Sequence, residues 1–220
     1  MIRNNKRELI LSSVLILLPS LIGVLLWDRL PQQMPIHWGV DGTADGWGSR
    51  EFVVFGMPVL LLALHWLCVF GTMMDKKNQG QNEKIFKVVL WITPVVMLFV
   101  SGMTYLSVLS GNNINAVRST LLFIGVIFVI VGNYLPKCRQ NHTIGIKVKW
   151  TLENEENWNV THRVAGRVWV AGGMLLLLCA FLPVASGVPV ILFGVMVLLA
   201  GYPILFSWQY HKKQIGNTKK

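Results

Sequence analysis

Long apolar runs alternate with short polar connections along this chain, and the pattern predicts an all-α integral membrane protein. A helix of about 17 to 25 apolar residues can cross about 30 Å of hydrocarbon. The fifth run reaches that length only if its helix continues past Arg167, whose side chain could extend to the interface. Six runs without Asp, Glu, Lys or Arg predict six transmembrane helices: Leu9 to Trp27, Phe52 to Met74, Val88 to Leu109, Ser119 to Leu135, Val168 to Pro183 and Val188 to Trp208.

The distribution of basic residues predicts the orientation. If the N-terminus is cytoplasmic, 17 of the 20 Lys and Arg lie in cytoplasmic segments and three lie outside. Lys and Arg near segment ends resist translocation, so we expect both termini in the cytoplasm. Two connections are then long enough for chemistry, an outer one over residues 28–51 between helices 1 and 2 and an inner one over residues 136–163 between helices 4 and 5. Residues 75–84 and 110–118 are expected to be mobile turns.

Composition excludes most soluble functions. The chain of 220 residues is 53% hydrophobic and only 14% charged, with a mean hydropathy of +0.53. Its formal net charge of +10 would indicate nucleic acid in a soluble protein, but here the whole basic excess falls on the predicted cytoplasmic face. Anionic lipid headgroups account for that charge, so membrane lipids are predicted partners and direct nucleic-acid binding is not needed.

The outer connection is predicted to be an ordered loop. Pro31 and Pro35 restrict its entry, and several glycines permit turns. His37, Asp41 and Asp45 have side chains that can bind zinc, but the sequence gives no further ligands. Local turns, in which each Asp accepts backbone amides, are the alternative that we favour. No cofactor is predicted, and a metal at this loop or near His162 is left open.

The inner connection is predicted to end in a helix that Thr151 caps and that runs into the fifth span. On it Glu155, Asn159 and His162 share a face, with Arg163 close by, so we expect a polar cluster at the inner membrane surface. The catalytic motifs H-E-x-x-H and G-x-S-x-G, the phosphate-binding P-loop and the Rossmann fingerprint do not occur in the sequence.

Inside the spans, packing explains the unusual residues best. His65 stands alone among apolar residues, and we expect a neutral imidazole hydrogen-bonded to a neighbouring helix rather than a proton carrier. Gly125 and Gly132 recur seven residues apart, as do Gly194 and Gly201, so each pair is expected to lie on one helix face and allow close helix approach.

Two groups of motifs resemble the SdpI family of bacterial membrane immunity proteins. The first is P-x-x-x-P-I-H-W followed by D-G-x-x-D in the outer connection. The second is G-N-Y-L-P-K, N-H-x-I-G-I, W-T-L, E-E-x-W and T-H-R in order along the inner connection. Carried over residue by residue, the marked positions are Pro35, His37, Trp38, Gly42, Asp45, Gly132, Asn133, Pro136, Asn141, Gly145, Trp150, Thr151, Glu155, Trp158, His162 and Arg163.

The resemblance implies a multi-pass protein of the bacterial cytoplasmic membrane with two domains, residues 1–110 and 111–220. It implies protection against a secreted peptide toxin and, in one system, signalling by holding an ArsR-type repressor at the membrane. It implies no enzyme activity. The residues leave open an alternative, an intramembrane enzyme or small-molecule transporter that uses His37 or His162.

Overall fold

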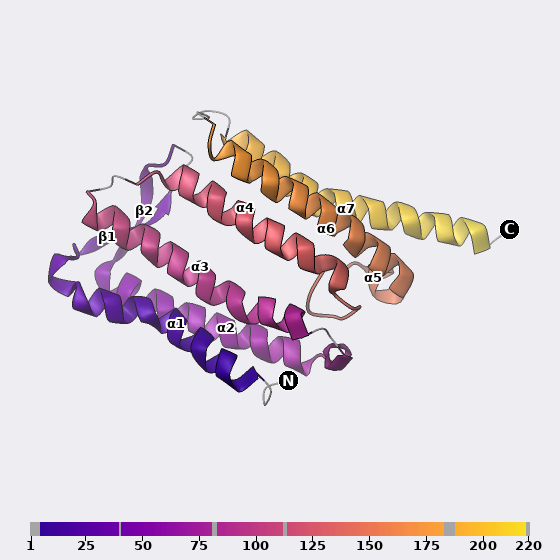
Figure 1. The fold of residues 1–220 in the computed structure, drawn as a ribbon, viewed down its shortest axis with the longest axis horizontal. Coiled ribbons are helices and arrows are strands. Elements are labelled where there is room, and N and C mark those ends of the chain that lie inside the picture. The colour runs from indigo at the N-terminus through magenta and orange to yellow at the C-terminus, as the bar shows by residue number, and fades with distance from the viewer. Residues whose placement is uncertain (1–4, 40, 81–82, 112–113, 183–187, 219–220) are drawn as a thin grey trace. The chain divides into compact units, whose positions relative to one another are not determined.

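Helices make up most of the computed structural model, which describes residues 5–39, 41–80, 83–111, 114–182 and 188–218 (Figure 1). The long helices are α1 (Lys6–Leu25), α2 (Met57–Met74), α3 (Glu83–Leu109), α4 (Ala116–Tyr134), α6 (Glu155–Cys179) and α7 (Val188–Thr218). The shorter elements are η2 (Trp27–Arg29), β1 (Gln33–Trp38), β2 (Ala44–Ser49), the π-helix η3 (Phe52–Gly56), η4 (Lys76–Gly80), η5 (Leu135–Lys137) and α5 (Lys149–Glu153).

Among the described residues, five helical segments are long and apolar enough to cross a membrane. They contain α1, α2, α3, α4 and α7. Helix α6 is not one of them, because its first half carries Arg163 and Arg167 and its first turn carries two Glu. Pro183, the expected end of this span, lies outside the described residues. The prediction of a membrane protein built from helices holds, and the sixth span stays a prediction.

Large apolar side chains cover the outside of these helices. Leu25, Leu67, Met74 and Phe193 are each more than two thirds exposed. Contiguous exposed apolar surface is unfavourable in water but favourable against lipid chains. The exposed faces therefore support burial of these helices in a bilayer.

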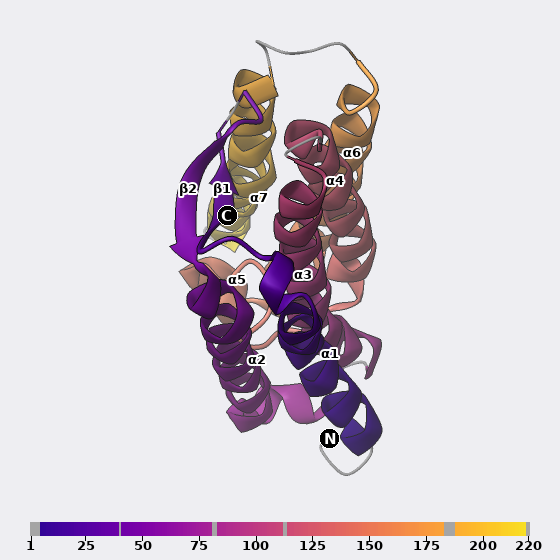
Figure 2. The same cartoon turned by 90° about the vertical axis from the view of Figure 1, so that its left-hand side faces the viewer.

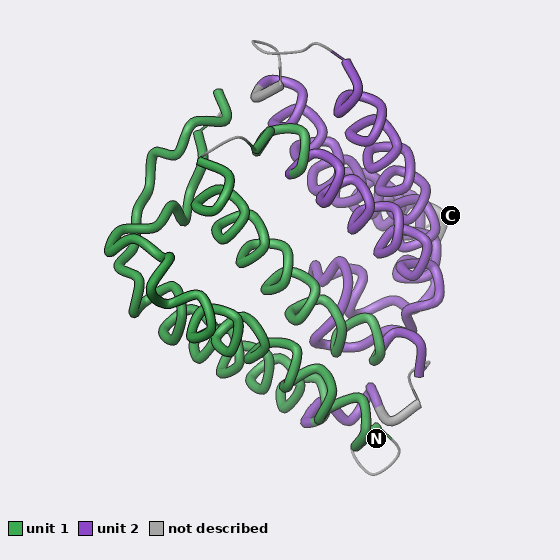
Figure 3. Tube along the Cα trace, turned by 60° about the vertical axis from the view of Figure 1, so that its left-hand side comes forward, with its two compact units in different colours: residues 1–73, 86–119 green, residues 74–85, 120–220 purple. Residues whose placement is uncertain are grey.

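The chain divides into two compact units, which interleave along the sequence (Figure 3). Unit 1 contains residues 1–73 and 86–119, and unit 2 contains residues 74–85 and 120–220. The short segment around η4 thus belongs to the second unit although its neighbours in sequence belong to the first. The division at residue 110 drawn from the sequence stays a prediction.

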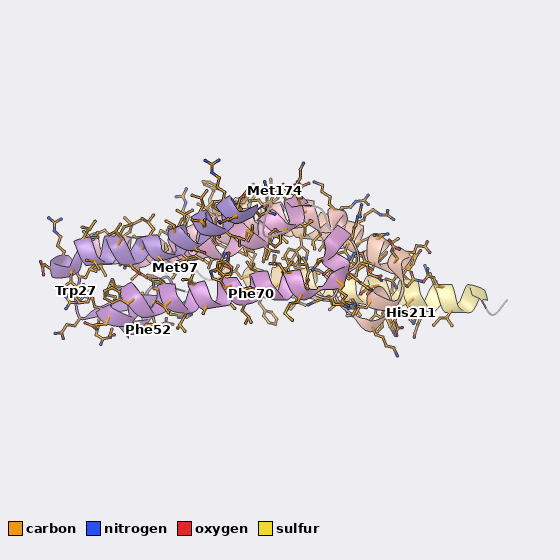
Figure 4. All side chains as sticks on the ribbon, turned by 90° about the horizontal axis from the view of Figure 1, so that it is seen from below. Trp27, Phe52, Phe70, Met97, Met174 and His211 are labelled. Atoms are coloured by element: carbon orange, nitrogen blue, oxygen red, sulfur yellow. The ribbon has the colours of Figure 1, made fainter. Side chains whose placement is uncertain are left out.

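Unit 1 combines α1, α2 and α3 with a two-stranded antiparallel hairpin, β1–β2. Its core beneath the hairpin contains Leu30, Met34, Val53, Val54 and Tyr105. Trp27 and Phe52, which flank the hairpin in sequence, lie at the same end of the unit (Figure 4). The strands were not expected from the sequence, since four glycines and two prolines obscure the alternation typical of strands.

His65 links two helices within unit 1. Its Nε2 lies 3.0 Å from Ser12 Oγ on α1, and both residues are fully buried. The expected bond to a neighbouring helix is confirmed. In hydrocarbon, such a bond is one of the few directional contacts between helices.

In unit 2, two glycine pairs bring α4 against α6. A Cβ on Gly125 would lie 2.9 Å from the Gly173 carbonyl oxygen, and one on Gly132 would lie 2.9 Å from the Gly166 carbonyl oxygen. The close approach expected of Gly125 and Gly132 is confirmed, and their partners are Gly166 and Gly173, which the sequence did not predict. The same expectation for Gly194 and Gly201 is wrong within the described chain, where neither position has an atom within 4 Å of an added Cβ.

Candidate functional site

The hairpin carries the first group of family-like residues. Its strands pair Pro35 with Trp47 and His37 with Gly46. At the tip, the Gly39 amide donates to the Thr43 carbonyl (2.8 Å), and Gly42 takes a φ of +81°, which glycine adopts without a steric penalty. The positive φ therefore explains why a glycine stands at position 42, and no ligand is needed to explain it.

Two acidic side chains gather at this tip. Asp41 Oδ1 accepts the Thr43 amide (3.0 Å) and its hydroxyl (2.8 Å), and these bonds hold the pKa of the Asp41 carboxyl below its usual value. A Cβ on Gly39 would lie 3.0 Å from Asp41 Oδ1 and 3.1 Å from Asp45 Oδ2. Both carboxylates therefore flank Gly39 and make the tip anionic.

His37 and Asp45 form an exposed pair. Nδ1 of His37 lies 2.5 Å from Asp45 Oδ1, with side chains 72% and 52% exposed. The carboxylate fixes the ring orientation and leaves Nε2 free of that bond. Within the described residues, no three His, Cys, Asp or Glu side chains converge as a metal site would require. Trp38, next in sequence, is half-buried.

Contacts at both ends fix the hairpin on unit 1. The Thr104 hydroxyl of α3 donates to the Pro35 carbonyl (2.9 Å). Arg50 Nη1 donates to the carbonyls of Trp27 (3.0 Å) and Leu30 (3.2 Å), and its guanidinium lies 4.1 Å from the centre of the Trp27 ring. A guanidinium can donate hydrogen bonds in its plane and also stack on an aromatic ring. Arg50 therefore holds the end of β2 against η2 and Leu30.

The second group of family-like residues lies in unit 2, in the connection from α4 to α6 (residues 135–154) and at the adjoining ends of these two helices. Asn141 is fully buried at its centre. Its Nδ2 donates to the carbonyls of Arg139 (2.8 Å) and Ile144 (2.9 Å), and its Oδ1 accepts the amides of Thr143 (2.8 Å) and Ile144 (2.6 Å). The Asn141 side chain thus supplies hydrogen bonds to four backbone groups that would otherwise need water. These bonds determine the path of the connection.

His162 completes this folded connection from α6. Its ring stacks on Trp158 with centroids 4.0 Å apart. Nε2 accepts the Ile146 amide (3.0 Å), so the neutral ring carries its proton on Nδ1 and donates it to the Trp158 carbonyl (2.8 Å). Burial of this ring, which precedes the apolar run of α6, lowers its pKa to about 4. The ring is therefore neutral at physiological pH.

Gly145 is the residue that allows the chain to cover His162. Its φ is +116°, and a Cβ there would collide with His162 Nε2 and approach the Trp158 ring at 3.1 Å. Trp158 in turn donates Nε1–H to the Cys138 carbonyl (2.8 Å). Gly145 from the connection thus packs with Trp158 and His162, which lie one helical turn apart on α6.

Trp150 and Thr151 belong to the short helix α5. The Thr151 hydroxyl accepts the Val148 amide (3.1 Å) and donates to the Ile146 carbonyl (2.8 Å), while Trp150 Nε1 donates to Ser207 Oγ on α7 (2.6 Å). The expectation that Thr151 caps the long helix is wrong. The chain leaves α5 in an extended conformation at Asn154, whose side chain accepts the Asn157 amide (2.7 Å) and caps α6.

The expected cluster of Glu155, His162 and Arg163 is also wrong. Both ring nitrogens of His162 already bond backbone groups, and Glu155 and Arg163 are exposed. The helix face is shared, but the connection covers His162 and leaves Glu155 exposed. Asn133 on α4 is exposed as well. The structure thus brings together Asn141, Gly145, Trp158 and His162, and it leaves Asn133, Glu155 and Arg163 outside that core.

The segment around η4 binds this connection, a contact that the sequence did not predict. Asp75 Oδ2 accepts the His142 amide (2.7 Å), and Asn78 Nδ2 donates to the Thr143 hydroxyl (2.7 Å). Residues 75–80 are therefore bound to the connection, and the expectation of a mobile turn is wrong for them. In the sequence, this segment is a polar stretch with an Asp and an Asn. Many surface turns contain the same residue types, so the sequence does not predict the contact.

Comparisons with known proteins agree with both groups of motifs. Residues 137–207 match the model of the SdpI/YfhL protein family, and residues 14–62 match a model described as a domain of unknown function (DUF1648). The immunity protein SdpI of Bacillus subtilis (strain 168) is 27% identical over 213 residues, which cover 94% of this chain and 98% of that protein. No solved structure matches the chain. With the apolar helices, these matches identify a multi-pass protein of the bacterial cytoplasmic membrane.

Proposed function

Because this chain belongs to the SdpI family, we propose that it is an immunity protein that protects its host bacterium from a secreted antimicrobial peptide. The observation that carries the proposal is the match to the immunity protein SdpI, which covers 94% of this chain, and so parts of both units, and 98% of that protein.

Six transmembrane spans with both termini in the cytoplasm are part of this proposal. The division of basic residues supports the orientation, since 17 of the 20 would remain inside. Exposed apolar residues late in α6, among them Leu175 and Leu178, support α6 as the fifth span. Arg163 and Arg167 are exposed near its beginning and would reach the headgroup layer.

In this orientation the hairpin is the surface that meets a peptide arriving from outside. It is anchored through Arg50 and Thr104, and it presents His37, Asp45 and Trp47 to solvent. A fixed surface loses little conformational entropy on binding, which favours recognition. We assign toxin binding to this hairpin.

The connection from α4 to α6 would then lie at the cytoplasmic surface. Lys147 and Lys149 are exposed on it, while Asn141 and His162 hold its backbone. The fixed, basic connection supports a docking role, and an ArsR-type repressor is the partner that the family resemblance implies. Signalling is the finer part of the proposal and needs a test separate from immunity.

The alternative of an enzyme or transporter that uses His162 has less support. A catalytic base needs a nitrogen within reach of substrate, whereas both nitrogens of His162 bond backbone groups and the ring is fully buried. His37 is exposed, so turnover by purified protein that depends on His37 would restore this alternative.

The test is a protection assay in a toxin-sensitive bacterium that expresses the chain. The cells are challenged with the sporulation-delay toxin and with each secreted peptide encoded beside the gene. We expect wild type to raise the inhibitory concentration of one peptide at least tenfold. His37→Ala should reduce this protection, and His142→Ala, an exposed histidine on the other connection, is the matched control. Absence of protection against all of these peptides would refute the immunity proposal.

A further inference from the structure

We propose that the outer edge of strand β2, at Trp47 and Ser49, binds an extended cationic segment of the peptide toxin as an added strand. This inference rests on the proposed immunity function and specifies how the hairpin would hold its ligand. Strand addition uses backbone hydrogen bonds, so it requires an unpaired edge in the correct register.

The register shows which backbone groups face outward. The Arg50 amide donates to the Gln32 carbonyl (2.9 Å), so these two residues form a hydrogen-bonded pair. Bonded and non-bonded pairs alternate along an antiparallel ladder. Counted from that pair, the first pair (Gln33 with Ser49) is non-bonded, the second (Met34 with Gly48) is bonded and the third (Pro35 with Trp47) is non-bonded. The N–H and C=O of Trp47 therefore point away from β1.

The two edges of the hairpin differ. On the β1 edge, Pro35 has no N–H to offer, and its carbonyl accepts the Thr104 hydroxyl of α3. On the β2 edge, the same reasoning turns the backbone groups of Ser49 outward, since Ser49 pairs with Gln33. Within the described residues, no backbone partner from another element is found for Trp47. Figure 2 shows β2 as the outer strand of the pair.

Two residue types that discourage pairing at an exposed edge, Lys and Pro, are absent from β2. The Trp47 side chain is instead 50% exposed and offers a large apolar surface beside the free backbone groups. The edge is suited to an added strand.

Charge defines the segment that would bind. Asp41 and Asp45 flank Gly39 at the tip of the hairpin, and Asp41 is held ionised by its bonds to Thr43. Residues 28–51 contain four acidic residues and two arginines, and one of these, Arg50, is committed to the Trp27 and Leu30 carbonyls. Complementary charge favours a Lys- or Arg-bearing segment over an acidic one.

Trp47→Pro tests the backbone contribution. Because the Trp47 N–H points outward, proline removes a donor for the added strand and leaves the bonds between β1 and β2 intact. Trp47→Ala is the matched control, since it removes the same side chain and retains the donor. In the protection assay we expect Trp47→Ala to lose the contribution of the side chain alone, and Trp47→Pro to tolerate at least tenfold less peptide than Trp47→Ala.

A second measurement, independent of any variant, is hydrogen–deuterium exchange on the purified wild-type protein with the peptide that it protects against. Exchange in residues 44–49 should slow on addition of that peptide. Equal protection by both variants, equal loss in both, or unchanged exchange would overturn strand addition while leaving immunity intact. If exchange in residues 44–49 is slow without peptide and depends on protein concentration, the edge binds a second copy of the chain. If it is slowed by anionic lipid vesicles instead, the edge binds lipid. If wild type protects against none of the peptides, the proposed function itself fails.

Discussion

Gly145→Ala should destabilise unit 2 more than its φ alone predicts. Gly145 has a φ of +116°, where a side chain costs about 1 to 3 kcal/mol, and its added Cβ would also collide with His162 Nε2. Relief of that collision breaks the Ile146 bond to the buried ring, at roughly 1 to 3 kcal/mol. With about 1 kcal/mol from φ and about 2 kcal/mol from the broken bond, we expect a total loss of about 3 kcal/mol.

Gly111→Ala is the matched control, because Gly111 also has a positive φ, +65°, but nothing lies within 4 Å of its Cβ position. A loss of 1 kcal/mol lowers the melting temperature of a domain of this size by about 2 to 4 °C. The melting temperature in detergent, measured by tryptophan fluorescence, should thus fall by about 6 to 12 °C for Gly145→Ala and by about 2 to 4 °C for Gly111→Ala. Equal shifts in the two variants would refute the role assigned to the His162 contact.

Three further predictions concern packing, pH and topology. Gly173→Val should separate α4 from α6 and lower the melting temperature by several degrees, whereas Gly194→Val, where the Cβ position is open, should change it by less than about 2 °C. The His162 pKa is about 4 in the folded protein against an ordinary 6.5, so only the unfolded chain takes up this proton between these values. Stability should fall as pH drops from 6.5 to 4, by up to about 1.4 kcal/mol per pH unit, and His162→Gln should flatten that slope in melts recorded across this range. Single cysteines at the exposed positions Gln33 and Lys147, in a background without native Cys, should react differently with an impermeant maleimide on intact cells, and labelling of Lys147→Cys alone would reverse the proposed orientation.

The hydropathy pattern determined the class of this protein. Runs without charged residues predict membrane helices because hydrocarbon cannot solvate charges or unpaired backbone groups. The seven-residue spacing of Gly125 and Gly132 likewise indicated a close helix contact, since only small residues let helix backbones approach. The first inference succeeds because it depends on one segment and its solvent. The glycine spacing is a weaker indicator, because a contact also needs a second helix, and within the described chain Gly194 and Gly201 meet none.

Other features depended on contacts between segments far apart in sequence, and only the tertiary structure determined them. The hairpin was missed because its register is held by Thr104 and Arg50 rather than by strand propensity. His162 and Glu155 share a helix face, yet one is buried and the other exposed, because a loop held by Asn141 covers only His162. Helical periodicity gives the direction of a side chain, but burial depends on what packs against that side chain, and the packing partners come from the whole chain.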